Sequence, residues 1–178
     1  MESNTNTSLK IIMLGEYNAG KTSLIYRYTK RDQEADRCSP SLLYQEAPLN
    51  ISGQEVTLRI WDTSSQERYI RKLSTLYFHD SHGALVVYDV TSRTSFEATT
   101  FWLDEARIKI PREISVILVG NKSDLASARE VSYEEGVSRA NECGVGFIET
   151  SADDCTNVEA AFTSLAAIAF RKLTSRSC

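Results

Sequence analysis

The chain has 178 residues, of which 42% are hydrophobic and 25% charged, a composition that fits one domain with a substantial core. Its net charge of -4 and isoelectric point near 5.3 give no indication of the strongly basic surface typical of nucleic-acid-binding proteins. No apolar run approaches the roughly 20 residues that span a membrane, and the polar N-terminus lacks the basic and apolar regions of a signal peptide.

Short apolar runs alternate along the chain with segments of helical periodicity, which predicts an α/β fold with helices on both faces of a parallel sheet. The second and third runs are separated only by Ser52-Gly53, so we expect them to pair as an antiparallel hairpin. The sequence therefore predicts a six-stranded, mostly parallel sheet with one antiparallel strand, and a ligand site where the carboxyl ends of the strands meet. In chain order, we expect strands at 9–14, 44–51, 54–61, 83–88, 114–119 and 145–148, and helices at 20–31, 67–78, 95–108, 133–143 and 156–173.

The first predicted strand and helix flank Gly15-Glu16-Tyr17-Asn18-Ala19-Gly20-Lys21-Thr22, which is the pattern G-x-x-x-x-G-K-[ST]. Its glycines let the backbone curl so that successive N–H groups point at one phosphate chain, and the following helix aims its positive end at the same anion. Lys21 can reach the outer phosphates, and the Thr22 hydroxyl can ligate Mg²⁺. The alternative is a glycine-containing turn without a ligand. The candidate nucleotide contacts in this segment are Tyr17, Asn18, Ala19, Gly20, Lys21, Thr22 and Ser23.

A carboxylate, Asp62, follows the third predicted strand. Near a bound phosphate, a carboxylate at the end of a strand can hold Mg²⁺, here through a water molecule. The alternative role of Asp62 is to cap the N-terminus of the helix that follows.

Two further polar motifs follow the fifth and sixth predicted strands. In the first, Asp124 can accept parallel hydrogen bonds from N1–H and the 2-amino group of guanine, which adenine does not offer. The stem of Lys122 can cover the base, and Asn121 can tie this motif to the phosphate loop. In the second, Ser151-Ala152, the backbone N–H of Ala152 can reach O6 of guanine.

These motifs, in this order, resemble those of the small GTPase superfamily across nearly the whole chain. Within it the sequence is similar to the Rab family, because residues 61–69 read WDTSSQERY where Rab proteins have WDTAGQERY. The resemblance implies a Ras-like P-loop NTPase fold and a Rab-like GTPase domain at 9–173, between a flexible tail at 1–8 and a short tail at 174–178. It also implies a molecular switch that binds GTP or GDP with Mg²⁺ and hydrolyses GTP slowly.

The resemblance assigns roles to residues beyond the phosphate loop. Gln66 orients the attacking water, and the backbone N–H of Ser65 contacts the γ-phosphate. Ser39 stands where relatives have a threonine that ligates Mg²⁺. Three aromatic residues stand where Rab proteins face their effectors, and the alternative is that they only pack the hairpin and a helix: Tyr44, Trp61 and Tyr77.

Several departures from the family pattern lie on the γ-phosphate side. Ser65 replaces a glycine, and Tyr17 replaces a glycine or small polar residue. Counting back from the tryptophan gives Ser39 as the magnesium ligand, whereas counting forward from the lysine gives Pro40. No aromatic residue stands near Gln33, where relatives stack a ring on guanine. These departures keep open an alternative function, a nucleotide-binding interaction module with negligible hydrolysis.

The resemblance also implies partners and a location. Effector proteins, an exchange factor and a GTPase-activating protein are expected to recognise switch segments at about 32–44 and 63–78, which order and disorder with the nucleotide. We expect a monomer that has no nucleic-acid partner. It should lie in the cytoplasm and at the cytosolic face of endomembranes, where it would act in vesicle trafficking. Membrane contact is expected only through a lipidated C-terminus, for which Cys178 is the candidate.

Overall fold

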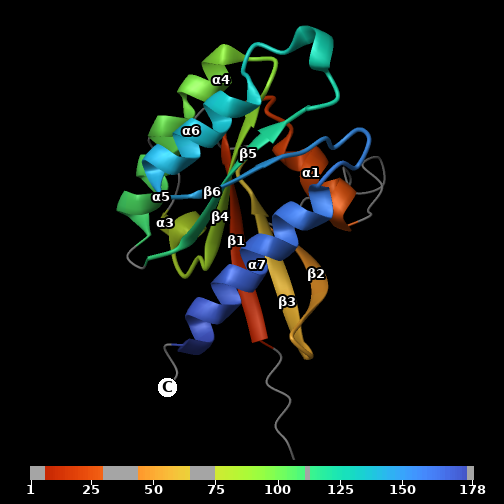
Figure 1. Cartoon of the computed structure of the whole chain (residues 1–178). Coiled ribbons are helices and arrows are strands. Elements are labelled where there is room, and N and C mark those ends of the chain that lie inside the picture. The colour runs from red at the N-terminus through yellow and green to blue at the C-terminus, as the bar shows by residue number, and fades with distance from the viewer. Residues whose placement is uncertain (1–6, 30–43, 65–74, 111–112, 176–178) are drawn as a thin grey trace, which may run out of the picture.

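A computed structural model describes residues 7–29, 44–64, 75–110 and 113–175. They form a six-stranded sheet in the order β2-β3-β1-β4-β5-β6, in which β2 and β3 are antiparallel and the other neighbours parallel (Figure 1). The predicted sheet, with its one antiparallel pair, is confirmed. The strands are β1 (Thr7–Gly15), β2 (Tyr44–Ile51), β3 (Gln54–Asp62), β4 (Gly83–Asp89), β5 (Ser115–Asn121) and β6 (Gly146–Glu149).

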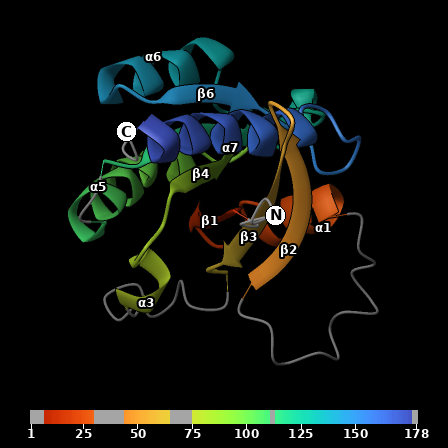
Figure 2. The same cartoon turned by 90° about the horizontal axis from the view of Figure 1, so that it is seen from below.

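Helices cover both faces of this sheet, as predicted. Apolar side chains of α1 and α7 pack on one face, and those of α3, α4, α5 and α6 pack on the other (Figures 1 and 2). Among the described helices, none combines the length and the apolar character needed to cross a membrane. Their bounds are α1 (Lys21–Thr29), α3 (Thr75–Phe78), α4 (Arg93–Glu97), α5 (Thr99–Lys109), α6 (Tyr133–Cys143) and α7 (Val158–Ser175), and a short 3₁₀ helix, η2, spans Ala126–Ala128.

Strand β1 shows how the sequence builds this two-sided core. Alternate side chains of a strand point to opposite faces. Leu9, Ile11 and Met13 accordingly join the core beneath α1 and α7, whereas Ile12 and Leu14 join the core beneath α5. A strand that is buried on both faces reads as a continuous apolar run, which is why β1 and β4 were recognisable from the sequence.

Several predicted boundaries differ from the structure. The expected helix at 95–108 is wrong as a single element, because α4 ends at Glu97 and α5 begins at Thr99. The Thr99 hydroxyl donates to the Phe96 carbonyl at 2.6 Å, a local side-chain bond that competes with the regular helix ladder. Strand β1 begins at Thr7 rather than Leu9, and α7 spans 158–175 rather than 156–173. Of the helix expected at 67–78, the described part is 75–78.

Helix α6 begins with a capping box. The Ser132 hydroxyl accepts a bond from the Glu135 N–H, and the Glu135 carboxylate accepts one from the Ser132 N–H at 2.9 Å. The same carboxylate pairs with Arg93 of α4, with an Nη1–Oε1 distance of 2.5 Å. The bond from Arg93 and then the bond from the Ser132 backbone lower the pKa of Glu135 to about 2.

We expect Glu135→Gln to reduce the loss of folding stability that occurs as the pH falls into the acid range. Because the folded-state pKa lies below the ordinary value of 4.5, this carboxylate stabilises the fold above that pH, and its contribution is lost as the pH falls towards 2. Thermal unfolding midpoints between pH 6 and pH 2.5 should therefore fall less steeply in Glu135→Gln than in the wild type. Glu134→Gln, which removes a first-turn charge without removing the Arg93 pair, should keep the wild-type slope. Equal slopes in all three proteins would contradict the prediction.

Candidate functional site

The polar motifs meet at one edge of the sheet. The loop after β1, Asp62 at the end of β3, Asn121 at the end of β5 and Ser151 just after β6 all lie at carboxyl ends of parallel strands. This is the edge at which open α/β sheets bind ligands. The arrangement expected from the order of the motifs is therefore present.

The loop between β1 and α1 curls through left-handed backbone conformations. Gly15 has φ +139°, Asn18 +64° and Gly20 +92°, which only glycine and asparagine adopt at low cost. Lys21, 2% exposed, donates from Nζ to the carbonyls of Gly15 at 3.0 Å and Glu16 at 2.7 Å. The ammonium group is thus held across the mouth of the loop, where a phosphate would be attracted to it.

A cluster of oxygen atoms lies beside the start of α1. The Thr22 hydroxyl donates to Asp62 Oδ2 at 2.6 Å and contacts Ser64 Oγ at 3.0 Å. The Ser64 hydroxyl and N–H both donate to Asp62 Oδ1, at 2.5 and 2.9 Å. Asp62 therefore accepts bonds both from the backbone just after β3 and from Thr22 of the phosphate loop, whereas its alternative role as a helix cap concerns residues outside the described ones.

Hydroxyl and carboxylate oxygens are ligands that Mg²⁺ accepts, usually together with water and phosphate oxygens. Within the part of the chain that the structure describes, no group of three or more His, Cys, Asp or Glu residues is placed so that it could hold a metal ion. The Thr22–Asp62 pair accordingly fits a cation that takes most of its ligands from a bound phosphate and from water. Ser64 was missed by the sequence reasoning, because only the folded chain shows how close it lies to Thr22.

A pocket of about 410 Å³ opens next to the phosphate loop. Asn121, a buried residue of its lining, donates from Nδ2 to the Ala19 carbonyl at 2.9 Å and accepts from the Thr150 hydroxyl at 3.1 Å. The predicted tie between the fifth-strand motif and the phosphate loop is therefore present, and Thr150 is an additional residue that holds it. The pocket is lined by Gly20, Ser23, Arg27, Asn121, Lys122, Asp124, Leu125, Ala152 and Asp153.

Two polar groups of this pocket have no partner within the described part of the chain. The exposed carboxylate of Asp124 makes no hydrogen bond or ion pair with the described residues, and the backbone N–H of Ala152 has no acceptor among them. One group is an anionic acceptor and the other a neutral donor. They are complementary to a flat ligand that presents donors at one edge and an acceptor beside them.

Lys122 borders the same pocket with its backbone at φ +65°. Its Nζ pairs with Asp89 Oδ2 at 2.5 Å, which holds the side chain against the end of β4. Burial alone would raise the pKa of Asp89, but hydrogen bonds from Lys122 and Thr91 outweigh it and lower that pKa. The anchored ammonium leaves the aliphatic stem of Lys122 as part of the pocket wall.

The remaining predicted site residues divide into three groups. Ser151 is buried and builds its own loop, because its Oγ accepts from the N–H groups of Asp153 and Asp154, both at 3.2 Å. Tyr17 is 68% exposed on the phosphate loop. The other three lie outside the described residues: Ser39, Ser65 and Gln66.

The three predicted effector-facing aromatics form one cluster. Tyr44 and Trp61 are a cross-strand pair with ring centroids 5.2 Å apart, and Tyr77 meets Trp61 edge-on at 5.7 Å. Tyr77 is buried, whereas Tyr44 and Trp61 are half-buried. The packing role is present, and two of the rings keep an accessible part.

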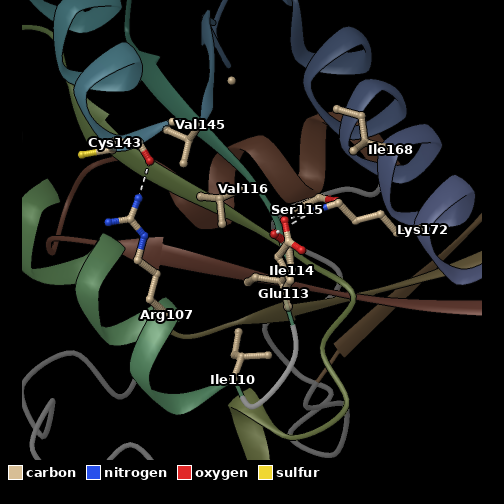
Figure 3. A pocket seen from close by; sticks show the side chains of 12 residues that line it. Arg107, Ile110, Glu113, Ile114, Ser115, Val116, Cys143, Val145, Ile168 and Lys172 are labelled. Carbon is tan, nitrogen blue, oxygen red and sulfur yellow. Dashed lines mark hydrogen bonds and ion pairs between the residues drawn. The ribbon is translucent and has the colours of Figure 1, made fainter. Parts of the chain in front are cut away.

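A larger pocket, of about 600 Å³, lies at the opposite end of the sheet (Figure 3). It is bordered by the first residues of β5 and β6 and by the last turns of α5 and α7. Arg107 of α5 crosses its edge and donates to the carbonyl of Cys143. None of the predicted site residues lines it, so we do not take this pocket as the functional site, although it is larger than the pocket of about 410 Å³.

Comparison with known proteins gives a family and close relatives. The sequence model of the Ras family matches residues 10–171. Over 154 residues, the chain is 44% identical to Ras-related protein RABA5e of Arabidopsis thaliana, an alignment that covers 86% of this chain and 70% of the relative. It is 42% identical to Ras-related protein RABA5d of the same plant, with the same length and coverage.

Proposed function

Since this chain belongs to the Ras family of small GTPases, we propose that it is a Rab-like molecular switch that binds GTP and GDP with Mg²⁺ and hydrolyses GTP slowly. The pocket of about 410 Å³ carries the proposal. In it, Asp124 can accept from N1–H and the 2-amino group of guanine, and Ala152 N–H can donate to O6. Adenine would leave the Asp124 carboxylate poorly paired, so the pocket favours guanine.

The phosphate loop supports the rest of the proposed ligand. The backbone of residues 17–23 would hold the phosphates at the start of α1, and Lys21 would exchange a carbonyl contact for an outer phosphate oxygen. Thr22, Asp62 and Ser39 are the proposed residues for Mg²⁺, with Asp62 acting through a water molecule. A bound Mg²⁺ would neutralise charge on the β- and γ-phosphates.

For hydrolysis we propose Gln66 as the residue that orients the attacking water and Ser65 N–H as a γ-phosphate contact. The competing proposal is an interaction module with negligible hydrolysis. Tyr17 favours it, because a ring that is 68% exposed on the phosphate loop could block an arginine supplied by an activating protein. Such an arginine accelerates hydrolysis by roughly 10³–10⁵ in this class of enzyme.

Single-turnover phosphate release at saturating Mg²⁺·GTP separates the two proposals. For a switch, we expect Gln66→Ala to slow release by at least about ten-fold, since a positioned catalytic group contributes on the order of 10²–10⁴ to a rate. Gln54→Ala, a change at the exposed start of β3, is the matched control and should release phosphate at the wild-type rate. A rate that Gln66→Ala does not reduce would favour the interaction module.

We further propose that the chain acts as a monomer in vesicle trafficking. The accessible parts of Tyr44 and Trp61 and the adjoining switch segments would recognise effectors, and regulators would act on the nucleotide site. The similarity to Rab-related proteins supports an endomembrane role, with Cys178 as the proposed lipid attachment point. An unmodified Cys178 in the intact mass of protein recovered from its own cells would contradict the attachment.

A further inference from the structure

Arg27 of α1 contacts the loop after β6. It follows Ser23 by four residues, so both side chains lie on one face of the helix, and both line the pocket of about 410 Å³. Its Nε donates to the Ala152 carbonyl at 2.7 Å, and its Nη2 donates to the Asp153 carbonyl at 3.1 Å. One guanidinium group therefore fixes two successive peptide carbonyls.

Three backbone N–H groups of this loop are bonded to acceptors within the loop. Ser151 Oγ accepts from the N–H groups of Asp153 and Asp154, and the Ser151 N–H donates to the Thr156 carbonyl at 3.0 Å. With the two carbonyls held by Arg27, the Ala152 N–H is a donor in this turn that has no acceptor among the described residues. The contacts leave that donor available in the pocket wall.

We propose that Arg27 is a positioning residue of the base pocket, which aims the Ala152 N–H at the O6 atom of a guanine base. The guanidinium suits this role because its rigid fork bonds two acceptors at once, whereas a lysine ammonium bonds as a mobile point charge. The inference rests on the proposed function, and it adds a residue that the binding motifs do not contain.

The affinities for three nucleotides distinguish a positioning role of Arg27 from a general loss of structure in the Arg27→Ala variant. GDP offers O6 and the 2-amino group, 6-thio-GDP replaces O6 with a weaker acceptor, and IDP keeps O6 but lacks the 2-amino group. Affinities are measured by competition against a fluorescent GDP analogue, with Mg²⁺ present. We expect Arg27→Ala to lower the affinity for GDP and IDP about ten-fold, because one well-aimed hydrogen bond is lost. The affinity for 6-thio-GDP should fall less than about two-fold.

Two further variants complete the test. Arg107→Ala removes the comparable arginine-to-carbonyl contact at the opposite end of the sheet, seen in Figure 3, and should leave all three affinities unchanged. Arg27→Lys, which keeps the charge but not the fork, should fall between the wild type and Arg27→Ala.

Two results would overturn the inference while leaving the proposed function standing: wild-type GDP affinity in Arg27→Ala, or an equal loss for all three nucleotides. A wild-type protein that does not bind GDP would overturn the proposed function itself, and this inference with it.

Discussion

Asp124→Asn is expected to abolish tight binding of GDP and to create a preference for xanthosine diphosphate. The wild-type carboxylate makes no bond to the described residues, so its acceptor capacity is available to the base. Asparagine would face the 2-amino group of guanine with its own amide donor, whereas xanthine carries an oxygen at that position and matches it. Losing two charge-assisted bonds of about 1.5–3 kcal/mol each corresponds to roughly 10²–10⁴ in affinity.

The measurement is direct binding of GDP, xanthosine diphosphate and ADP to each protein by isothermal titration calorimetry, because a guanine-based probe would not report on a variant that has lost guanine binding. Asp153→Asn is the matched control, because Asp153 borders the same pocket and the Arg27 contact involves its backbone carbonyl rather than its side chain. We expect this control to keep the wild-type order of affinities. A GDP preference that survives Asp124→Asn would show that another group reads the base.

The sequence was sufficient to place the motifs because parallel strands constrain them. An apolar run followed directly by polar residues marks the carboxyl end of a buried strand, and all such ends share one edge of the sheet. Asn121 is an example, because its bond to the phosphate loop was predicted from the motif and is present at 2.9 Å. Helix boundaries were harder, because the break at Ala98 coincides with a local bond from the Thr99 hydroxyl to the Phe96 carbonyl, which helical periodicity does not indicate.

Arg27 could not be predicted, for a different reason. Its helical spacing from Ser23 is visible in the sequence, but its two partners lie 125 and 126 residues further along the chain. Nothing in a run of residues indicates which carbonyls a surface arginine will reach. The same holds for Ser64, because its contact with Thr22 depends on how closely the end of β3 approaches the start of α1. Motifs predict which chemistry a site has, whereas the contacts that position it appear only in the fold.

Gly20→Ala is expected to disrupt both the phosphate loop and the base pocket. Gly20 has φ +92°, and an added Cβ would lie 2.2 Å from Asn121 Nδ2. The buried Asn121 side chain is the nearest group to that Cβ, so we expect it to shift and to weaken its bonds with Ala19 and Thr150. Unsatisfied buried polar groups and backbone strain together should cost on the order of 3 kcal/mol of folding free energy. Because the lost tie joins the base pocket to the phosphate loop, we expect GDP affinity to fall more than about 100-fold.

Gly53→Ala separates the collision from the backbone strain. Gly53 lies at the β2–β3 turn with φ +85°, and no atom would lie within 4 Å of its added Cβ. Its cost should therefore be limited to strain of about 1–2 kcal/mol, with no effect on GDP affinity. Urea unfolding of both variants, with and without GDP, measures the two costs. The prediction would be contradicted if Gly20→Ala were no more destabilising than Gly53→Ala and still bound GDP tightly. That result would mean that Asn121 can move away from Ala19 at little cost. The bond between these two residues would then not be what joins the base pocket to the phosphate loop.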